Sequence, residues 1–413
     1  MTADQPRDGT GEGGRRTGNR FPASVGADKF TADFLEGLRA IGDPEADDAV
    51  AEFFAATATT HVDLFRHLGR ISTSGLPDEN LPGLSAFVAE EVPWPAWAED
   101  AKDLVDDGQR VFDRWGPQLG MGLFMASLPA TYVKARGAET LVRTARMSDN
   151  PRRRILETCQ MLLDVMTPDA LVPGKKGYAT IRHVRLVHAA VRYVLTHHDE
   201  VLALTGKDLG AWDEAALGVP VNQADLLGCM FSFSVIGLRS LIRSGVTLSD
   251  DEQAAYNLTV NLFGHQLGLR DDLLPLSVTD SSVIWDAISA AEDKESDAGS
   301  ELTGHLVACI QELAVFKHLK GLPATGIRFY LGDETADRLH VDQADWTRHF
   351  FSLVMRTDSV LGRVVERMGG RHSLSAIVGR EVIESFELSR RQGDRPGFRV
   401  SDELREAWGI TSV

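Results

Sequence analysis

Apolar residues recur three and four positions apart along most of this chain, and this spacing limits the possible fold more than any other feature. It places apolar side chains on one face of an α-helix, whereas a half-buried strand alternates at every second position. Pro44, Pro151 and Ser249 stand where helices commonly begin, and Gly245 stands where one commonly ends. The pattern predicts an all-α fold of about a dozen or more helices, without a repeat of fixed period. It is clearest in the segments 44–69, 152–166, 181–198, 223–245 and 249–269.

The helical pattern fits one large multi-helix domain with a tail at each end. The chain has 413 residues, of which 43% are hydrophobic, so it can bury a sizeable core. Residues 1–25 are rich in glycine and polar residues and are expected to be a disordered tail. The helical domain is predicted over 26–390, with a C-terminal tail over 391–413. The apolar stretch 226–238 is too short to span a membrane and predicts a buried core helix.

Charge and cysteine content exclude several classes of protein. The chain has 43 basic and 60 acidic residues and a net charge of -17, which disfavours nucleic acid and anionic lipid as partners. Cys159, Cys229 and Cys309 lie far apart without CxxC spacing, which argues against a disulfide framework or a thiolate zinc site. The arginine pair near the N-terminus is not followed by the apolar segment of an export signal. We therefore expect a cytoplasmic location.

The stretch "VRLVHAAVRYVL" at 184–195 places His188 between Arg185 and Arg192 on one side of an apolar helix. One interpretation is a core histidine that is hydrogen-bonded to a neighbouring helix. The other is an axial ligand to haem iron, with Ala189 and Ala190 leaving room for a flat macrocycle. The two arginines could then bind haem propionates, or they could form ion pairs with Asp or Glu on a neighbouring helix.

A resemblance to a known family favours the haem interpretation. "HVRLVHAAVRYVL", followed by "VPVNQADLLGCMFSF" and "NLFGHQLGLRDDLLP", resembles the catalytic domain shared by latex-clearing protein (rubber oxygenase) and the MpaB-type oxygenases. The upstream segments "SLPATYVKARGAETLVRTARM" and "RRRILETCQMLLDVMTPDAL" resemble the same family, and the match runs from Val111 to Pro275. The resemblance implies an all-helical domain that binds haem b through His188 as the proximal iron ligand. It also implies oxygen-dependent cleavage of carbon–carbon double bonds in isoprenoid chains.

The distal side departs from the rubber enzyme. Arg143 and Thr144 match a lysine–threonine pair whose lysine can occupy the sixth iron position. Arginine stays protonated and has no lone pair for iron, so we expect an open or water-filled sixth site. Arg143 could donate hydrogen bonds to dioxygen or peroxide there, or it could form a salt bridge. The base glutamate of the rubber enzyme has no clear counterpart, although Glu139 is nearby. Cys229 and Phe231 replace a threonine and a histidine, which predicts a less polar pocket and leaves the reaction type open.

Asp225 and His265 are candidates for supporting the haem site. Asp225 lies near a predicted helix start, where it could orient His188, pair with Arg185 or serve as a helix cap. His265 matches a family histidine and could support the site from outside or make a structural hydrogen bond.

Rival metal sites have little support. Asp271 and Asp272 resemble part of an aspartate-rich terpene synthase motif, but its third aspartate is absent. No Glu-x-x-His pair of a di-iron bundle occurs, and we interpret His61, Asp63, His67 and the pair His197–His198 as solvated or structural.

Together these features predict a haem b-dependent oxidoreductase, an oxygenase that acts with dioxygen or peroxide on an intracellular lipophilic small molecule. An isoprenoid or a biosynthetic intermediate fits this prediction better than extracellular rubber. Two alternatives remain: a haem-binding sensor or carrier without catalysis, and a haem-free helical protein that binds an apolar ligand. The sequence leaves the substrate, the oligomeric state and the role of residues after about 280 open.

Overall fold

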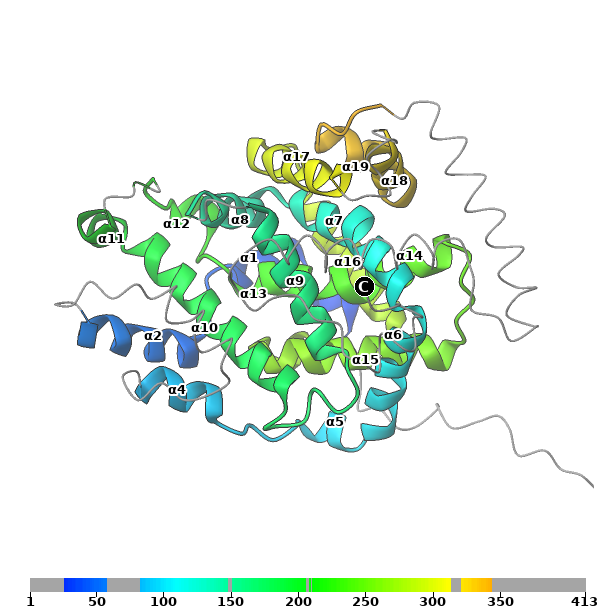
Figure 1. Ribbon diagram of the computed structural model, residues 1–413, viewed down its shortest axis with the longest axis horizontal. Helices are drawn as coiled ribbons and strands as arrows, with labels where there is room; N and C mark the ends of the chain where they lie inside the picture. Colours follow the sequence, from blue (N-terminus) through cyan, green and yellow to red (C-terminus); the bar gives the residue numbers. More distant parts are fainter. Residues whose placement is uncertain are drawn as a thin grey trace, which may run out of the picture.

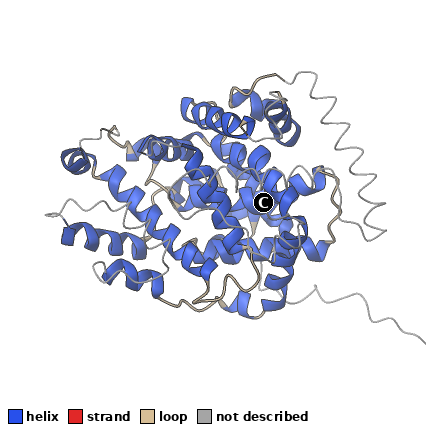
Figure 2. Ribbon diagram, viewed as in Figure 1, coloured by secondary structure: helices blue, strands red, loops and turns tan. Residues whose placement is uncertain are grey.

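The computed structural model describes residues 26–57, 82–147, 151–205, 208, 210–312 and 321–343. Within these ranges the chain is almost entirely helical and contains no β-strand, only an isolated bridge between Lys134 and Asp293 (Figure 2). The predicted all-α fold class is confirmed, and a single helical domain is consistent with the structure. The predicted domain end at 390, the C-terminal tail, the N-terminal tail and the residues His61, Asp63 and His67 lie outside the described ranges.

Helix boundaries follow the sequence signals closely. α2 and α9 begin at Pro44 and Pro151, and Ser249 caps α15 in a capping box with Glu252. Gly245 follows the last turn of α14 with φ +86°, a backbone conformation that favours glycine. The α-helices are α1 (Ala32–Leu38), α2 (Pro44–Thr57), α4 (Pro82–Ala89), α5 (Ala96–Glu99), α6 (Lys102–Gly122), α7 (Leu128–Tyr132), α8 (Ala135–Met147), α9 (Pro151–Val165), α10 (Lys176–Thr196), α11 (His198–Thr205), α12 (Glu214–Leu217), α13 (Gln223–Phe231), α14 (Gly237–Arg243), α15 (Asp250–Gln266), α16 (Val278–Glu292), α17 (Asp297–Gln311), α18 (Leu322–Leu331) and α19 (Asp333–Arg338).

Two long helices change their winding in the middle. α6 continues into α7 through the π-helical turn η2 (Leu123–Ser127), and α13 continues into α14 through a second π-helical turn, η3 (Ser232–Ile236). The two turns pack against each other, and Ser127 Oγ donates a hydrogen bond to the Ser232 carbonyl at 2.6 Å. A π turn widens the helix and changes its pattern of backbone hydrogen bonds. The Ser127 hydroxyl therefore joins the two helices where both depart from α geometry.

The continuous helix Gln223–Arg243 forms part of the core. In the described part of the chain it is the one helix long and apolar enough to pass a test for a membrane span, with a mean hydropathy of 1.5. However, 78% of that apolar window is buried inside the structure. This is the buried core helix that the apolar stretch 226–238 predicts.

α6 and α15 pack along each other and form one side of the core (Figure 1). Gly108 allows this close approach, because a Cβ atom there would overlap Thr259 Oγ1 and the Ala255 carbonyl. Thr259 Oγ1 donates to the Val105 carbonyl at 3.0 Å across the same contact.

α10 lies between two different neighbours. α9 packs on one side, and α2 and α4 pack on another (Figure 1). Leu186, Ala189 and Ala190 of α10 form a small apolar cluster that is separate from the main core. Their partners on α2 and α4 are Ala46, Val50, Phe53, Leu84 and Phe87. α10 therefore joins α2 and α4 to the rest of the molecule.

Candidate functional site

His188 lies in the second half of α10 and is half-buried. At roughly 100° per residue, it shares its side of the helix with Ile181, Val184 and Arg192. Ile181 belongs to the main core cluster and Val184 packs against it. The imidazole is therefore on the side of α10 directed away from the small cluster with α2 and α4.

The two alanines next to His188 do not leave an open slot. Ala189 and Ala190 are 1% and 0% exposed and pack against side chains of α2 and α4. The expectation that they make room for a flat macrocycle is therefore wrong, because the N-terminal helices fill that space. A planar group near His188 would have to lie on the Val184 side of α10.

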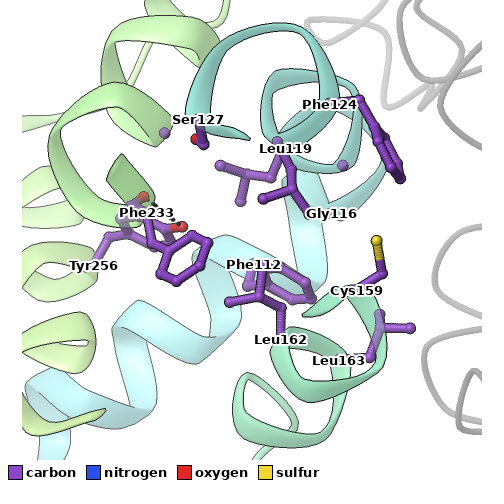
Figure 3. A pocket seen from close by; sticks show the side chains of 13 residues that line it. Phe112, Gly116, Leu119, Phe124, Ser127, Cys159, Leu162, Leu163, Phe233 and Tyr256 are labelled. Carbon is purple, nitrogen blue, oxygen red and sulfur yellow. Dashed lines mark hydrogen bonds between the residues drawn. The ribbon is translucent and has the colours of Figure 1, made fainter. Parts of the chain in front are cut away.

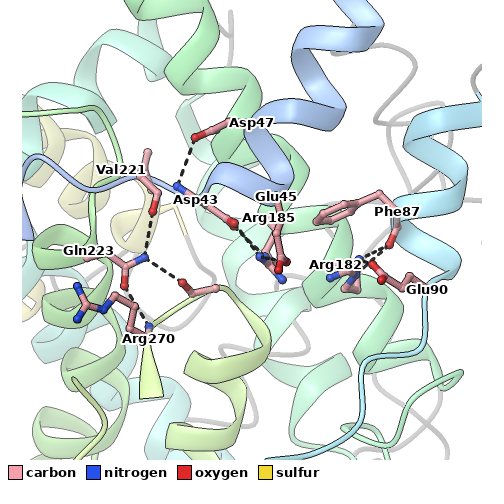
Figure 4. A network of polar contacts seen from close by, with 12 residues as sticks. Asp43, Glu45, Asp47, Phe87, Glu90, Arg182, Arg185, Val221, Gln223 and Arg270 are labelled. Carbon is pink, nitrogen blue, oxygen red and sulfur yellow. Dashed lines mark hydrogen bonds and ion pairs between the residues drawn. The ribbon is translucent and has the colours of Figure 1, made fainter. Parts of the chain in front are cut away.

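Arg182 and Arg185 of α10 bind carboxylates in and next to α2 and α4 (Figure 4). Arg185 donates to both oxygens of Asp43, with Nε···Oδ2 at 2.8 Å and Nη2···Oδ1 at 2.7 Å, and it also contacts Glu45 at 3.1 Å. Burial alone would lower the pKa of Arg185, but the hydrogen bonds and charge of Asp43 raise it above the ordinary value. Arg185 therefore forms ion pairs with acidic residues, which is one of the two alternatives that the sequence left open for it.

Arg192 and Arg182 make similar contacts. Arg192 Nε donates to Asp47 Oδ1 at 2.6 Å, and its Nη1 donates to the Val221 carbonyl at 3.1 Å. Burial raises the pKa of Asp47 despite the opposing charge of Arg192. Arg182 donates to the Phe87 carbonyl and to Glu90 at 2.6 Å. We call Arg182, Arg185 and Arg192 with these partners the arginine anchor.

The arginine anchor retains unused donors. Arg192 Nη2 and Arg182 Nη1 are buried without a hydrogen-bond partner in the structure. A buried guanidinium N–H without an acceptor is costly, and a carboxylate is its preferred partner. Arg192 lies one helical turn after His188. An imidazole with one unused guanidinium N–H a turn away could hold haem iron and one propionate, so the residues present are compatible with this group.

Asp225 does not contact His188 or Arg185 in the structure. It lies in the first turn of α13, whose N-cap is Asn222, and its carboxylate accepts from Arg39 Nη1 and Asn222 Nδ2, both at 2.9 Å. Burial raises the pKa of Asp225, and the charge of Arg39 opposes this shift. The suggested pairing with Arg185 is wrong, because Asp43 occupies Arg185 and Arg39 occupies Asp225.

Arg143 and Thr144 lie on α8. Arg143 Nη1 donates to the carbonyls of Gly210 and Ala211 at 3.0 and 2.9 Å, and its guanidinium lies 5.2 Å from the centre of the Trp212 ring. Its Nε is 3.5 Å from Glu139, which is the salt bridge that the sequence left open. Thr144 is buried, and its hydroxyl donates to the Thr140 carbonyl at 2.8 Å. In this structure Arg143 holds the segment before α12.

His265 lies in the last turn of α15 and contacts Asp271 through Nδ1 at 2.6 Å. This is the structural hydrogen bond considered as an alternative for that residue. The neighbouring Asp272 binds Lys29 at 2.7 Å and Arg270 at 2.9 Å. Although burial acts to raise it, these two cations lower the pKa of Asp272. Within the described ranges, no group of three or more His, Cys, Asp or Glu residues is placed to hold a metal ion.

Cys229 and Phe231, for which the sequence predicts a less polar distal pocket, both pack in the core. Phe231 is completely buried, and Cys229 packs half-buried against the core. Burial, reinforced by Asp225, raises the pKa of the Cys229 thiol to about 12. Cys229 is therefore a neutral thiol at physiological pH and cannot serve as a thiolate there.

The structure also contains an apolar cavity that the sequence did not predict. It lies where α6, η2, α9, η3, α14 and α15 meet (Figure 3). We call it the π-turn cavity. In the sequence, Gly116 and Gly120 are four residues apart and therefore lie on the same face of α6. This spacing was the one sign that part of the helix surface carries no side chains. Its lining residues are Phe112, Gly116, Leu119, Gly120, Leu123, Phe124, Ser127, Cys159, Leu162, Leu163, Phe233, Gly237 and Tyr256.

The sequence and the all-helical fold are similar to those of a family of oxygenases. The chain belongs to the family described as ER-bound oxygenase mpaB/B'/Rubber oxygenase, catalytic domain, whose model matches residues 110–358. It is 26% identical over 323 residues to the rubber oxygenase of Streptomyces sp. (strain K30), covering 72% of this chain and 70% of that protein. The solved structure of latex clearing protein LCP in the closed state shares the fold, with a TM-score of 0.65 and 18% identity over 93% of this chain and 100% of that chain. The family resemblance seen in the sequence is confirmed.

Proposed function

We propose that this protein is a haem b-dependent oxygenase that acts on a neutral lipophilic small molecule of the isoprenoid class. The match of the family's catalytic domain to residues 110–358, which include the whole of α10, is the observation that carries the proposal. The fit of His188 and Arg192 to a haem supports it. The substrate class comes from the resemblance and from the relative's name, rubber oxygenase.

In this proposal the chain's own residues hold and orient the cofactor. His188 would provide the imidazole nitrogen for the iron, and Arg192 Nη2 would donate to a propionate. The bidentate pair of Arg185 with Asp43 fixes the rotation of α10 and hence the direction of His188. When bound, haem supplies the activation of dioxygen or peroxide for attack on a carbon–carbon double bond. The apolar residues Val184 and Ile181 exclude water on that side of the helix.

The absorption spectrum of protein expressed with haem supplementation tests the cofactor. We expect a Soret band that His188→Ala abolishes or shifts. His183→Ala is the matched control, because it removes another imidazole from the same helix on a different side. No Soret band in the wild-type protein, even after reconstitution, would refute haem dependence. If both variants lose the Soret band equally, the loss results from disturbed packing of α10 and not from removal of an iron ligand.

Arg143 and Thr144 belong to the distal side in this proposal. To donate to an oxygen ligand, the Arg143 guanidinium would have to leave the carbonyls of Gly210 and Ala211. Arg143→Gln should then reduce oxygen-dependent turnover by about a hundredfold or more, the size of effect expected for loss of one electrostatic donor, while the Soret band persists. If turnover is unchanged and only the stability falls, Arg143 serves only to hold the segment before α12.

A second function, binding of an apolar ligand without haem, is favoured by the π-turn cavity. Its lining has no charged side chain among the described residues, so it suits a hydrocarbon regardless of any cofactor. This second function would apply if the purified protein binds lipophilic ligands and does not bind haem.

A further inference from the structure

We propose that Val221 is a positioning residue, which holds the Arg192 guanidinium so that one buried N–H stays free for a carboxylate. Val221 lies between α12 and α13, outside both helices. Its carbonyl accepts a hydrogen bond from Arg192 Nη1 at 3.1 Å. The inference rests on the proposed function, because the carboxylate is assigned to a propionate of haem b.

Val221 has a backbone conformation that its side chain disfavours. Its φ is +51°, and a β-branched residue in this left-handed region is a steric outlier. Val221 follows Pro220, and a proline followed by a positive φ is the pattern of a type II β-turn, whose third residue is normally glycine or asparagine. Strain of this kind persists only where surrounding contacts impose it, and it is concentrated at functional sites. The strain therefore indicates a role for Val221 beyond chain reversal.

Backbone contacts on both sides of Val221 hold the strained turn. Before it, Val219 N donates to the Arg39 carbonyl at 2.9 Å. After it, Gln223 N donates to the Ile41 carbonyl, also at 2.9 Å. Both acceptors lie between α1 and α2, outside the part of the chain that matches the family model. The N-terminal segment of this chain therefore fixes the turn that contacts α10.

Arg185 and Arg192 of α10 use their carboxylate partners differently. Arg185 donates to both oxygens of Asp43 through Nε and Nη2, which is a common bidentate arrangement. Arg192 donates to Asp47 through Nε alone, at 2.6 Å, while the Val221 carbonyl holds its Nη1. Arg192 is only 5% exposed, and its Nη2 is buried without an acceptor. Because a guanidinium is planar, the two bonds fix the direction of this third nitrogen.

Packing and hydrogen bonding keep Asp47 from taking the free N–H. A Cβ atom on Gly42 would lie 3.2 Å from Arg192 Cδ and 3.1 Å from Asp47 Oδ2, so this pair is closely packed. Asp47 Oδ2 also accepts from the Asp43 backbone N–H at 3.3 Å. A buried guanidinium N–H without an acceptor lowers stability, and a carboxylate is its preferred partner. Arg192 lies one turn after His188, so a propionate of a haem bound there is the carboxylate that fits.

Haem b and its dimethyl ester, in which both propionates are esterified, test the assignment. Each is titrated into full-length protein expressed without haem, and binding is followed by the Soret absorbance. We expect the wild-type protein to bind haem b at least about tenfold more tightly than the ester, a difference of about 1.4 kcal/mol, because the ester cannot form the charge-assisted hydrogen bond. A variant that merely disturbs the fold lowers both affinities and leaves their ratio unchanged.

Two variants at position 221 test the backbone direction. Val221→Pro fixes φ at about −65°, which turns the carbonyl away from Arg192 and should bring the ratio of the two affinities to about one. Val221→Asn is the matched control, because asparagine tolerates a positive φ, and it should keep the ratio within about twofold of wild type. A wild-type ratio in Val221→Pro, or equal loss of the ratio in both variants, would overturn the proposal.

A structure of the wild-type protein with haem b provides a second measurement if Val221→Pro does not fold. We expect Arg192 Nη1 to remain on the Val221 carbonyl, with Nη2 about 2.7–2.9 Å from a propionate oxygen. A propionate bound elsewhere would contradict the assignment.

The titrations separate this inference from the proposed function. If the wild-type protein binds neither haem b nor the ester, haem dependence is refuted and the inference fails with it. If it binds both with equal affinity, the haem proposal stands and only the inference fails. A preference for haem b that Val221→Pro abolishes and Val221→Asn retains supports both.

Discussion

The arginine anchor and the π-turn cavity are two interior regions built by opposite means. In the anchor, three cations of α10 bind carboxylates and carbonyls of segments about 30 to 145 residues away in sequence. In the cavity, the described lining has no charge, and the shape comes from irregular backbone and missing side chains. The comparison teaches that this fold fixes the direction of a helix with charge pairs and creates space with backbone geometry. Removing a side chain should therefore harm the anchor most, whereas adding one should harm the cavity most.

The largest effect is expected for Asp43→Ala in the anchor. This change leaves the Arg185 guanidinium buried without its bidentate partner and should lower the free energy of unfolding by about 3–5 kcal/mol, measured by urea denaturation. Glu45→Ala is the matched control, because Glu45 contacts the same arginine but its side chain is 72% exposed against 9% for Asp43. Its effect should stay below about 1 kcal/mol. Similar effects of the two variants would show that burial does not set the strength of the anchor.

His183 should make the stability of α10 depend on pH. Burial lowers the pKa of His183 from 6.5 to about 4, so the unfolded chain binds a proton between these values that the folded protein does not. The contribution of the neutral imidazole is complete above pH 6.5 and is lost as the pH falls toward 4. Between pH 7.5 and 4.5, the wild-type protein should lose about 2–3 kcal/mol more than His183→Gln, measured by urea denaturation. His305→Gln, at an exposed position on α17, should behave as the wild-type protein does. An equal loss in the wild-type protein and in His183→Gln would contradict the burial of this imidazole.

A smaller effect is expected where the two π turns meet. Ser127→Ala leaves the Ser232 carbonyl without its donor and should lower the free energy of unfolding by about 1–3 kcal/mol. It should also weaken hydrocarbon binding, because the turns would no longer be held together. Thr196→Ala removes a comparable hydroxyl–carbonyl bond at an exposed position of α10 and should cost less than about 0.5 kcal/mol. If the two variants are equally stable, the bond between the turns does not maintain the cavity.

The smallest effect is expected for Gly→Ala changes within helices, which distinguish empty space from close packing. Gly120→Ala and Gly304→Ala should each stabilise the protein by about 0.5–1 kcal/mol, because alanine favours helix and neither methyl group meets an obstacle. Gly108→Ala should instead destabilise it, since its methyl group would overlap Thr259 and the Ala255 backbone. Thermal denaturation of the three variants gives the comparison. A destabilised Gly120→Ala would mean that the space beside Gly120 is already filled.

The helical elements were predictable because their information is local. Periodicity indicated the helices, and Pro44, Pro151 and Ser249 marked starts that the structure confirms. The stretch around His188 was recognisable for the same reason: Arg185, His188 and Arg192 lie within about two turns of one helix. Such signals depend on neighbours that lie within four positions along the chain.

The remaining features depend on distant contacts. Asp43 lies 142 residues from Arg185, and Arg39 lies 186 residues from Asp225, so neither partner could be chosen from spacing. The burial of Ala189 and Ala190 depends on how α2 and α4 pack, which their own sequence does not reveal. The π turns are a change in hydrogen-bond register within continuous apolar helices, and a period of 3.6 residues does not expose them.

The π turns also bear on how this family could diversify. Each residue in an α-helix adds roughly 100° of rotation, so a single-codon deletion that converts η2 to regular α-helix would turn the whole of α7 relative to α6. Ser127 would then point away from Ser232, and the walls of the π-turn cavity would be rearranged without any change in its apolar composition. A lineage could in this way open or close a hydrophobic compartment through one insertion or deletion, a far shorter mutational path than replacing the thirteen residues that line it.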